Sequence, residues 1–136
     1  MKDTQLKKKR DAALYREYVK GLEEGRFASM CEAADYVIRQ PAPRFFISAK
    51  EASNRIGRIL SGKEHIDRRS PSQRRVLLLL DRYRDYLAEY PDCRLSRESI
   101  LEVLVQEPAP EFYLGWEAAR QILRREVSKR RKLWAG

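Results

Sequence analysis

The chain has 136 residues, with 29 Lys and Arg against 20 Asp and Glu, which gives a formal net charge of +9. This length suits one compact domain or two very small ones packed together, and a hydrophobic content of 43% excludes a disordered chain. The longest strongly apolar run covers only residues 76–80, so the sequence predicts no membrane-spanning helix. There is no apolar signal-peptide segment, and two cysteines are too few for a disulfide framework or a zinc site. We therefore expect a cytoplasmic protein with reduced thiols.

The first predicted helix is amphipathic. Leu14, Tyr18 and Leu22 stand at i, i+4 and i+8, which is the spacing of one apolar helix face. Gly25 is its predicted end. Four consecutive cations, residues 7–10, lie near the start of this segment and form one basic end of the chain.

A second helix is predicted to begin at Ser29, because Ser29 and Glu32 have the spacing of a capping box. Pro41 and Pro43 must end it, since proline lacks an amide hydrogen and forces its predecessor out of the helical region. The aromatic residues that follow are then placed on a stiff, extended connector. They could form a binding pocket for a peptide or a stacked base, but we favour a role as core residues.

The third predicted helix begins at a second capping box, Ser48 with Glu51, and ends near Gly62. Its apolar stripe consists of Ala52, Ile56, Ile59 and Leu60. The other side of the same helix carries basic and amide side chains.

The same order of features then occurs a second time. Residues 41–47 read PAPRFFI and residues 108–114 read PAPEFYL, at an offset of 67. Residues 15–19 match residues 83–87 at an offset of 68, so we expect one unmatched residue near Ala28. Chance rarely produces several such matches in one order. The sequence therefore indicates an internal duplication.

The predicted fold is all-α and internally duplicated, with two three-helix units that pack through their first helices into one compact helical domain. The first repeat spans residues 1–63, a linker residues 64–70, and the second repeat residues 71–136. In the second repeat we expect helices to begin at Ser70, at Ser96 and near Gly115. The two halves share the charge almost equally, with +5 on residues 1–66 and +4 on residues 67–136.

The sequence contains no arrangement that is typical of an active site. It has no Gly-rich phosphate loop, no G-x-S-x-G motif and no H-E-x-x-H motif. The single histidine, His65, lies in the linker with no second metal-ligating residue beside it. We therefore expect no catalytic activity, no bound metal and no cofactor.

The predicted third helices offer the best candidate for a binding surface. Each one mixes Lys or Arg with an amide side chain on one face, and these residue types bind phosphates and can read base edges in the major groove. A solvated charged face is the simpler alternative. The candidate nucleic-acid-binding residues are Lys50, Asn54, Arg55 and Arg58 in the first repeat, and Arg120, Gln121, Arg124 and Arg125 in the second.

These motifs also carry a resemblance. The order of a Ser-x-x-Glu helix, the element PAPRFF and another Ser-x-x-Glu helix resembles small basic proteins of an uncharacterised bacterial family with a PAPRFY-type element. It is also similar to helix-turn-helix modules, although the connector at residues 40–48 is longer than their turn of three or four residues. The resemblance implies a helix-turn-helix-like unit in each repeat and no established activity.

We expect a non-enzymatic nucleic-acid-binding protein that uses the basic third helices and the basic ends at residues 7–10 and 129–132, with duplex DNA as the favoured partner. The alternative is a protein–protein interaction module that receives its partner on the aromatic connectors or on an exposed part of the apolar stripe at residues 77–80. The sequence leaves the target sequence, the choice between DNA and RNA and the oligomeric state open.

Overall fold

A computed structural model describes the backbone of residues 2–135 and the side chains of residues 4–132. Within this range the chain forms helices joined by loops, without a β-sheet, so the predicted all-α class is confirmed. None of the described helices is long and apolar enough to cross a bilayer. The six helices are α1 (Lys2–Glu23), α2 (Met30–Ile38), α3 (Ala49–Leu60), α4 (Pro71–Glu89), α5 (Arg97–Leu104) and α6 (Trp116–Ala135).

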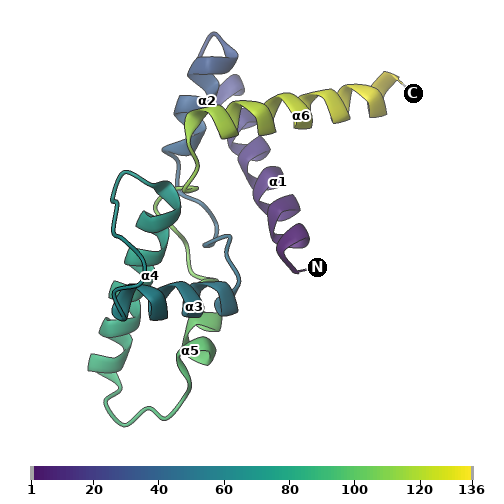
Figure 1. Cartoon of the computed structure of the whole chain (residues 1–136). Helices are drawn as coiled ribbons and strands as arrows, with labels where there is room; N and C mark the ends of the chain where they lie inside the picture. The colour runs from purple at the N-terminus through teal and green to yellow at the C-terminus, as the bar shows by residue number, and fades with distance from the viewer. Residues whose placement is uncertain (1, 136) are drawn as a thin grey trace.

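The helices pack in two groups of three (Figure 1). Helices α1, α2 and α6 contact one another and form what we call the outer body. Helices α3, α4 and α5 form the inner body, which is one continuous stretch of chain between two segments of the outer body. In Figure 1 the outer body lies above the inner body, and the loops after α2 and α5 run between them.

The two bodies are not the two sequence repeats. Each body combines the first two helices of one predicted repeat with the third helix of the other, because α6 packs on α1 and α2 while α3 packs on α4 and α5. The first helices of the repeats, α1 and α4, make no close backbone contact in the described part of the chain. Our expectation that the units pack through their first helices is therefore wrong. An apolar stripe shows which side of a helix is buried but not which helix covers it.

Contacts between α3 and α5 show how closely α3 packs against a helix of the other predicted repeat. Arg97 of α5 donates from Nε to the hydroxyl of Ser53 in α3 at 3.1 Å. Its guanidinium lies over Gly57, where a Cβ atom would stand only 2.9 Å from Nη2. A side chain at Gly57 would require the flexible end of Arg97 to move, so the glycine leaves room for this guanidinium.

The two connectors meet in an antiparallel bridge between the bodies. The amide of Ala42 donates to the carbonyl of Ala109 at 2.9 Å, and the amide of Ala109 donates back to Ala42 at 3.0 Å. These alanines are 67 residues apart, which is the offset of the repeated element. The bridge therefore joins matching positions of the two halves.

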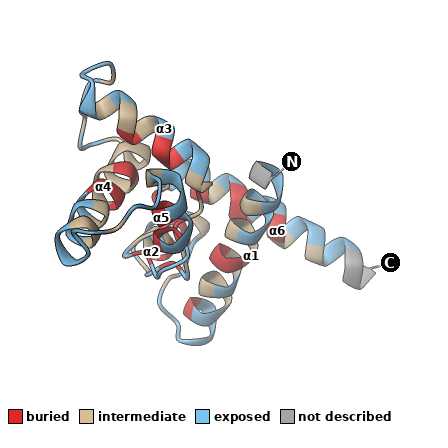
Figure 2. Cartoon of the chain, turned by 90° about the horizontal axis from the view of Figure 1, so that it is seen from below, coloured by how far each residue is buried: buried red, intermediate tan, exposed pale blue. Residues whose placement is uncertain are grey.

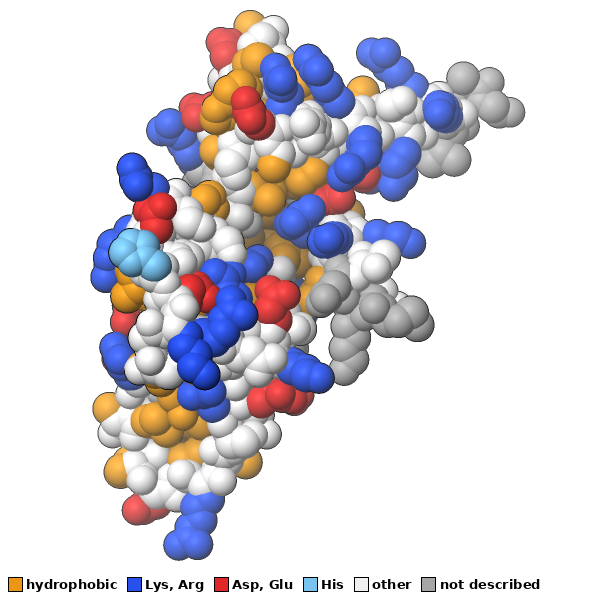
Figure 3. All heavy atoms as spheres, in the orientation of Figure 1, with side chains coloured by type: hydrophobic (Ala, Val, Ile, Leu, Met, Phe, Trp, Pro, Cys, Tyr) orange, Lys and Arg blue, Asp and Glu red, His pale blue; other side chains and the backbone are white. Residues whose placement is uncertain are grey.

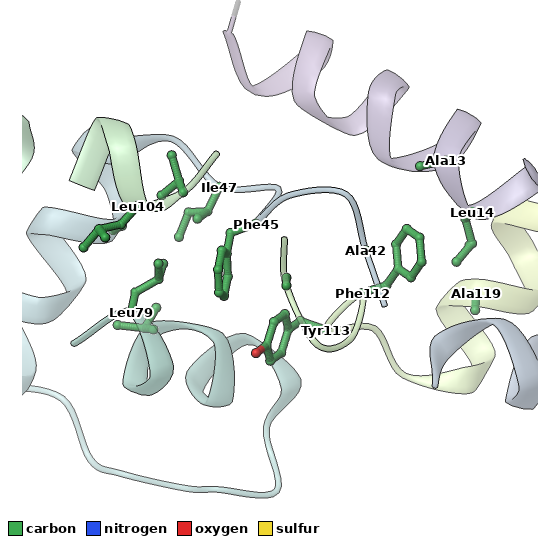
Figure 4. Close-up of a cluster of buried hydrophobic side chains, with 14 of the residues drawn as sticks. Ala13, Leu14, Ala42, Phe45, Ile47, Leu79, Leu104, Phe112, Tyr113 and Ala119 are labelled. Carbon is green, nitrogen blue, oxygen red and sulfur yellow. The ribbon is translucent and has the colours of Figure 1, made fainter. Parts of the chain in front are cut away.

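The connector aromatics are core residues, as we favoured. Phe45 is fully buried and Phe112 is 3% exposed. Figure 4 shows Phe45 beside Leu79 and Leu104 of the inner body, whereas Phe112 points toward Leu14 and Ala119 of the outer body. Each connector thus carries one ring into the body that it is about to enter.

The aromatic rings also pair across the connectors. Phe45 stacks on Tyr113 with 6.0 Å between ring centroids, and Phe112 stacks on Phe46 at 6.2 Å. Each pair joins the first aromatic position of one element to the second position of the other. The rings therefore link the two connectors by side chains as well as by backbone.

Four predicted helix starts are confirmed. The hydroxyls of Ser29, Ser48, Ser70 and Ser96 each accept an amide hydrogen bond from the third helical residue that follows. Such caps satisfy amides that have no partner inside the helix. The reciprocal bond of the first capping box is shifted by one residue, because the Glu32 carboxylate accepts from the amide of Ala28.

In part of the chain, residues that stand 67 positions apart are both buried. Ala33, Ala34 and Val37 of α2 are buried, and so are the three matching residues Ile100, Leu101 and Leu104 of α5. In the first helices, the offset of 68 does not relate buried positions to one another, because the residue that matches buried Leu14 is Arg82. Figure 2 shows buried positions on the helices of both bodies, while residues 127–132 of α6 are exposed or half-buried. The origin of the chain by duplication, and the repeat boundaries, stay predictions from the sequence.

Candidate nucleic-acid interface

The predicted residues of α3 are divided between solvent and an internal ion-pair cluster. Lys50 and Asn54 are exposed. Arg55 donates from Nη2 to Glu64 at 2.8 Å and also contacts the hydroxyl of Ser72. Arg58 donates to the other oxygen of Glu64 at 3.1 Å. Two of the four predicted α3 residues are therefore already engaged by one carboxylate.

Glu64 lies in the loop after α3 and joins this loop to two helices. Besides the two arginines, it accepts a hydrogen bond at 3.1 Å from Gln73 near the start of α4. The hydrogen bond from Arg55 is the main cause that holds the pKa of Glu64 below its ordinary value. Arg55 and Arg58 thus stabilise the inner body, and this role explains their charge without a nucleic acid.

The predicted residues of α6 lie on a different body from those of α3. Arg120 lies over the ring of Trp116, with 5.2 Å between Cζ and the ring centroid, and approaches the Cys31 sulfur at 3.7 Å. Arg125 forms an ion pair with Asp11 of α1 at 3.5 Å. Gln121 and Arg124 are exposed. Because α3 and α6 do not touch, the eight predicted residues do not form one site.

The positive charge is concentrated on two helices that pack on each other. Helices α1 and α6 together carry 14 basic and six acidic residues, a net charge of +8. The rest of the chain carries 15 basic and 14 acidic residues, a net charge of +1. Figure 3 shows Lys and Arg side chains along α6 and below it along α1. The helix exchange therefore gathers charge that the sequence halves share evenly.

Seven exposed cations, which lie in or near the two basic ends, make up what we call the α1–α6 basic surface. Its members are Lys7, Lys8 and Lys9 of α1, and Arg124, Lys129, Arg131 and Lys132 of α6. The two helices are held together beneath it by the Arg125–Asp11 pair and by Arg130, whose guanidinium stands 3.9 Å from the centroid of Tyr15. Arg130 also pairs with the buried carboxylate of Glu126 at 3.0 Å.

A groove of about 650 Å³ extends this surface toward the inner body. It lies between the N-terminal half of α1, the start of α3 and α5, and its cations are Lys9, Arg44 and Lys50. Glu98 and Glu102 of α5 also line it. One predicted α3 residue, Lys50, is thereby brought together with the basic run of α1.

A comparison of the chain with protein families, curated protein sequences and solved structures finds no match. The resemblance to helix-turn-helix modules and to a family with a PAPRFY-type element therefore stays a prediction. The described residues contain no group of three side chains able to hold a metal ion.

The sequence shows the two basic runs that contribute to the α1–α6 basic surface, but not that they belong together. The runs at residues 7–10 and 129–132 are evident as basic ends, but they stand about 120 positions apart. Only the packing of α6 on α1 brings them onto the same body.

Proposed function

We propose that this protein binds nucleic acid, with duplex DNA as the favoured partner, through the α1–α6 basic surface and without catalysing a reaction. The observation that carries the proposal is the concentration of +8 of the net charge of +9 on two contacting helices. Exposed Lys and Arg side chains on one body suit the phosphate backbone, and release of condensed counterions drives such binding.

Under this proposal, the eight predicted residues do not contribute equally to binding. Arg124 belongs to the basic surface, and Lys50 lies at the groove that extends it. Arg55 and Arg58 contribute less, because they share the Glu64 carboxylate, which offsets one of their two charges. The exposed amides of Asn54 and Gln121 would read bases only if the duplex reached them, and sequence preference stays a separate prediction.

The test compares two variants with the same loss of charge. In the first, Lys8, Arg124, Arg131 and Lys132 are replaced by Gln. In the matched control, Lys63, Arg68, Arg84 and Arg94, which are exposed and lie outside α1 and α6, are replaced by Gln. Fluorescence anisotropy with a labelled random duplex is recorded over a range of salt concentrations.

We expect the first variant to bind more weakly and to flatten the plot of log affinity against log salt by about 0.9 for each lost phosphate contact. The control should keep most of the wild-type slope. Equal losses in both variants would mean that total charge, and not this surface, is responsible. No measurable binding of the wild-type protein at low salt would refute the proposal.

The alternative is a protein-interaction module, but the surfaces that we expected it to use are not exposed. The connector rings are buried, Leu79 and Leu80 are buried, and Leu77 and Leu78 are half-buried. Large apolar side chains that remain exposed lie on both bodies, with Leu95 and Val103 near α5 of the inner body and Leu22 and Trp116 on the outer body. A partner protein would have to use those residues, and it becomes the leading candidate only if the duplex fails to bind.

A further inference from the structure

A small pocket lies at the corner where α1, the first connector and α4 meet. Its volume is about 200 Å³, and it is lined by Lys7 and Arg10 of α1, Ser48 and Glu51 at the start of α3, and Arg75 of α4. Three cations from two helices thus surround one cavity that holds a single carboxylate. The pocket adjoins the α1–α6 basic surface through Lys7.

Arg75 is the most buried of the three cations that line this pocket. Its side chain is only 14% exposed, and Nη1 donates to the carbonyl of Phe46 at 3.1 Å. The nearest carboxylate oxygen, on Glu51, is 3.8 Å from Nη2, which is longer than a hydrogen bond. Nε is buried without an acceptor. Buried polar groups in proteins nearly always have partners, so an arginine in this state requires an explanation.

The charges around Arg75 do not balance. Burial is the main cause that lowers its pKa, and the neighbouring Arg55 and Arg10 lower it further, whereas Glu51 opposes the shift. Arg10 is paired with Asp11 at 3.0 Å, and Lys7 is exposed. The pocket therefore has a surplus of positive charge, and a bound anion would relieve it.

We infer that this pocket binds a phosphate group. The planar guanidinium fork of arginine matches tetrahedral oxyanions, and lysine adds a point charge. The Ser48 hydroxyl and the first amides of α3 lie at the same end of the helix and favour a negative ligand. The Glu51 carboxylate would compete with the phosphate for Arg75. Its side chain is 48% exposed and can turn away to solvent.

This inference deepens the proposed function, because a nucleic-acid phosphate is one source of the ligand, but binding of free phosphate does not depend on it. The test therefore begins without nucleic acid. The melting temperature of the full chain is measured in sodium phosphate and in sodium chloride of equal ionic strength. We expect saturating phosphate to raise it by about 3 °C or more relative to chloride.

Three variants assign the effect to the pocket. Arg75→Lys keeps the charge but removes Nε and the fork, and it should weaken phosphate binding roughly tenfold or more. Glu51→Gln removes the competing carboxylate and should strengthen binding. Glu32→Gln is the matched control, because Glu32 occupies the same position after the cap of α2 and lies far from the pocket. If Arg75→Lys is unstable, Glu51→Gln against Glu32→Gln still decides the question.

Equal melting temperatures in phosphate and chloride for the wild-type protein would overturn the inference, as would identical phosphate responses in Glu51→Gln and Glu32→Gln. A second arm compares a duplex with a 5′-phosphate and the same duplex with a 5′-hydroxyl end. Preference for the phosphorylated end assigns the pocket to a terminal phosphate. Phosphate binding without any duplex binding keeps the pocket and rejects the proposed function.

Discussion

Phe45 and Phe112 occupy matching places in the two connectors, yet each ring completes a different core. Phe45 is covered by inner-body side chains and by the guanidinium of Arg82, whose Cζ lies 5.0 Å from the ring centroid. Phe112 packs in the outer body near Leu14. These rings show how one repeated motif can stabilise two bodies at once.

Replacing either ring by Ala should therefore lower the free energy of unfolding by about 3–5 kcal/mol, since the cavity left behind adds to the lost burial. Denaturant titration followed by circular dichroism measures this loss. Leu95→Ala serves as the control, because Leu95 is 58% exposed and its truncation should change stability by no more than about 0.5 kcal/mol. Unchanged midpoints for both Phe variants would show that the rings do not belong to the cores.

Tyr113 predicts a specific loss of stability in alkali. It is 7% exposed, it adopts a φ of 58°, and burial is the main cause that raises its pKa to about 12. The ordinary pKa is 10, so below pH 10 the phenol is neutral in both the folded and unfolded states and its contribution is complete. Between pH 10 and 12 only the unfolded chain ionises, and stability falls as the pH rises.

Tyr113→Phe should reduce this fall. Denaturation midpoints at pH 9 and pH 11 provide the measurement, and the difference between the two pH values should be smaller in the variant. Burial also raises the pKa of Tyr86, so some alkaline sensitivity will persist. An unchanged difference in Tyr113→Phe would contradict this account.

Among the secondary-structure elements, the loop after α3 depends on one acidic side chain. Glu64 is 10% exposed and joins Arg55 and Arg58 of α3 to Gln73 of α4. Without it, two arginines of the inner body would lose their shared partner. The loop between α3 and α4 is therefore fixed by charge as well as by the cap at Ser70.

Glu64→Gln should cost about 1–3 kcal/mol of stability at neutral pH, as expected for loss of charged hydrogen bonds. Because the pKa of Glu64 is lowered in the folded state, its contribution is complete above the ordinary value of 4.5 and is lost as the pH falls through the lower folded value. The variant should therefore lose less stability than the wild-type protein below pH 4.5. Asp35→Asn, which breaks the exposed Asp35–Arg39 pair, should have little effect and provides the comparison.

Local features of the elements were predictable from the sequence, and their partners were not. Serine caps and proline stops act within a few residues, so the start of α2 and the end of the same helix follow directly from Ser29 and Pro41. Leu22 and Leu60 continue predicted apolar stripes but are about half exposed, because each lies near the end of its helix, beyond the packed part. Neutralisation of Arg55 by Glu64 spans nine positions across a helix end, which no helical spacing indicates.

At the scale of the whole molecule, the exchange of third helices between the predicted repeats makes the inner body continuous and the outer body discontinuous. Helices α3 to α5 follow one another without interruption, whereas α6 must return to α1 and α2. The same exchange brings the two basic ends onto one body. The discontinuity of the outer body and the collection of both basic ends on it therefore have the same cause, the packing of α6 on α1 and α2.

A fragment of residues 44–114 contains the whole inner body with Phe45 and Tyr113, and it should fold alone with low but cooperative thermal stability. The sequence half at residues 67–136 has about the same length but lacks α3. It should not form a stable monomer, although two copies could exchange their third helices. Circular dichroism and analytical ultracentrifugation distinguish these outcomes. A stable, fully helical monomer of residues 67–136 would contradict the importance of the exchange.

The discontinuity of the outer body also determines what happens while the chain is being synthesised. Helices α1 and α2 leave the ribosome first, but α6 follows only after the chain between Ile38 and Trp116 has been translated, about 4–15 seconds later at roughly 5–20 residues per second. During that interval α1 and α2 can cover each other but lack the cover that α6 supplies, while the inner body can already complete its core. The nascent chain should therefore be most dependent on chaperones, and most prone to aggregation, through the segment that was made first.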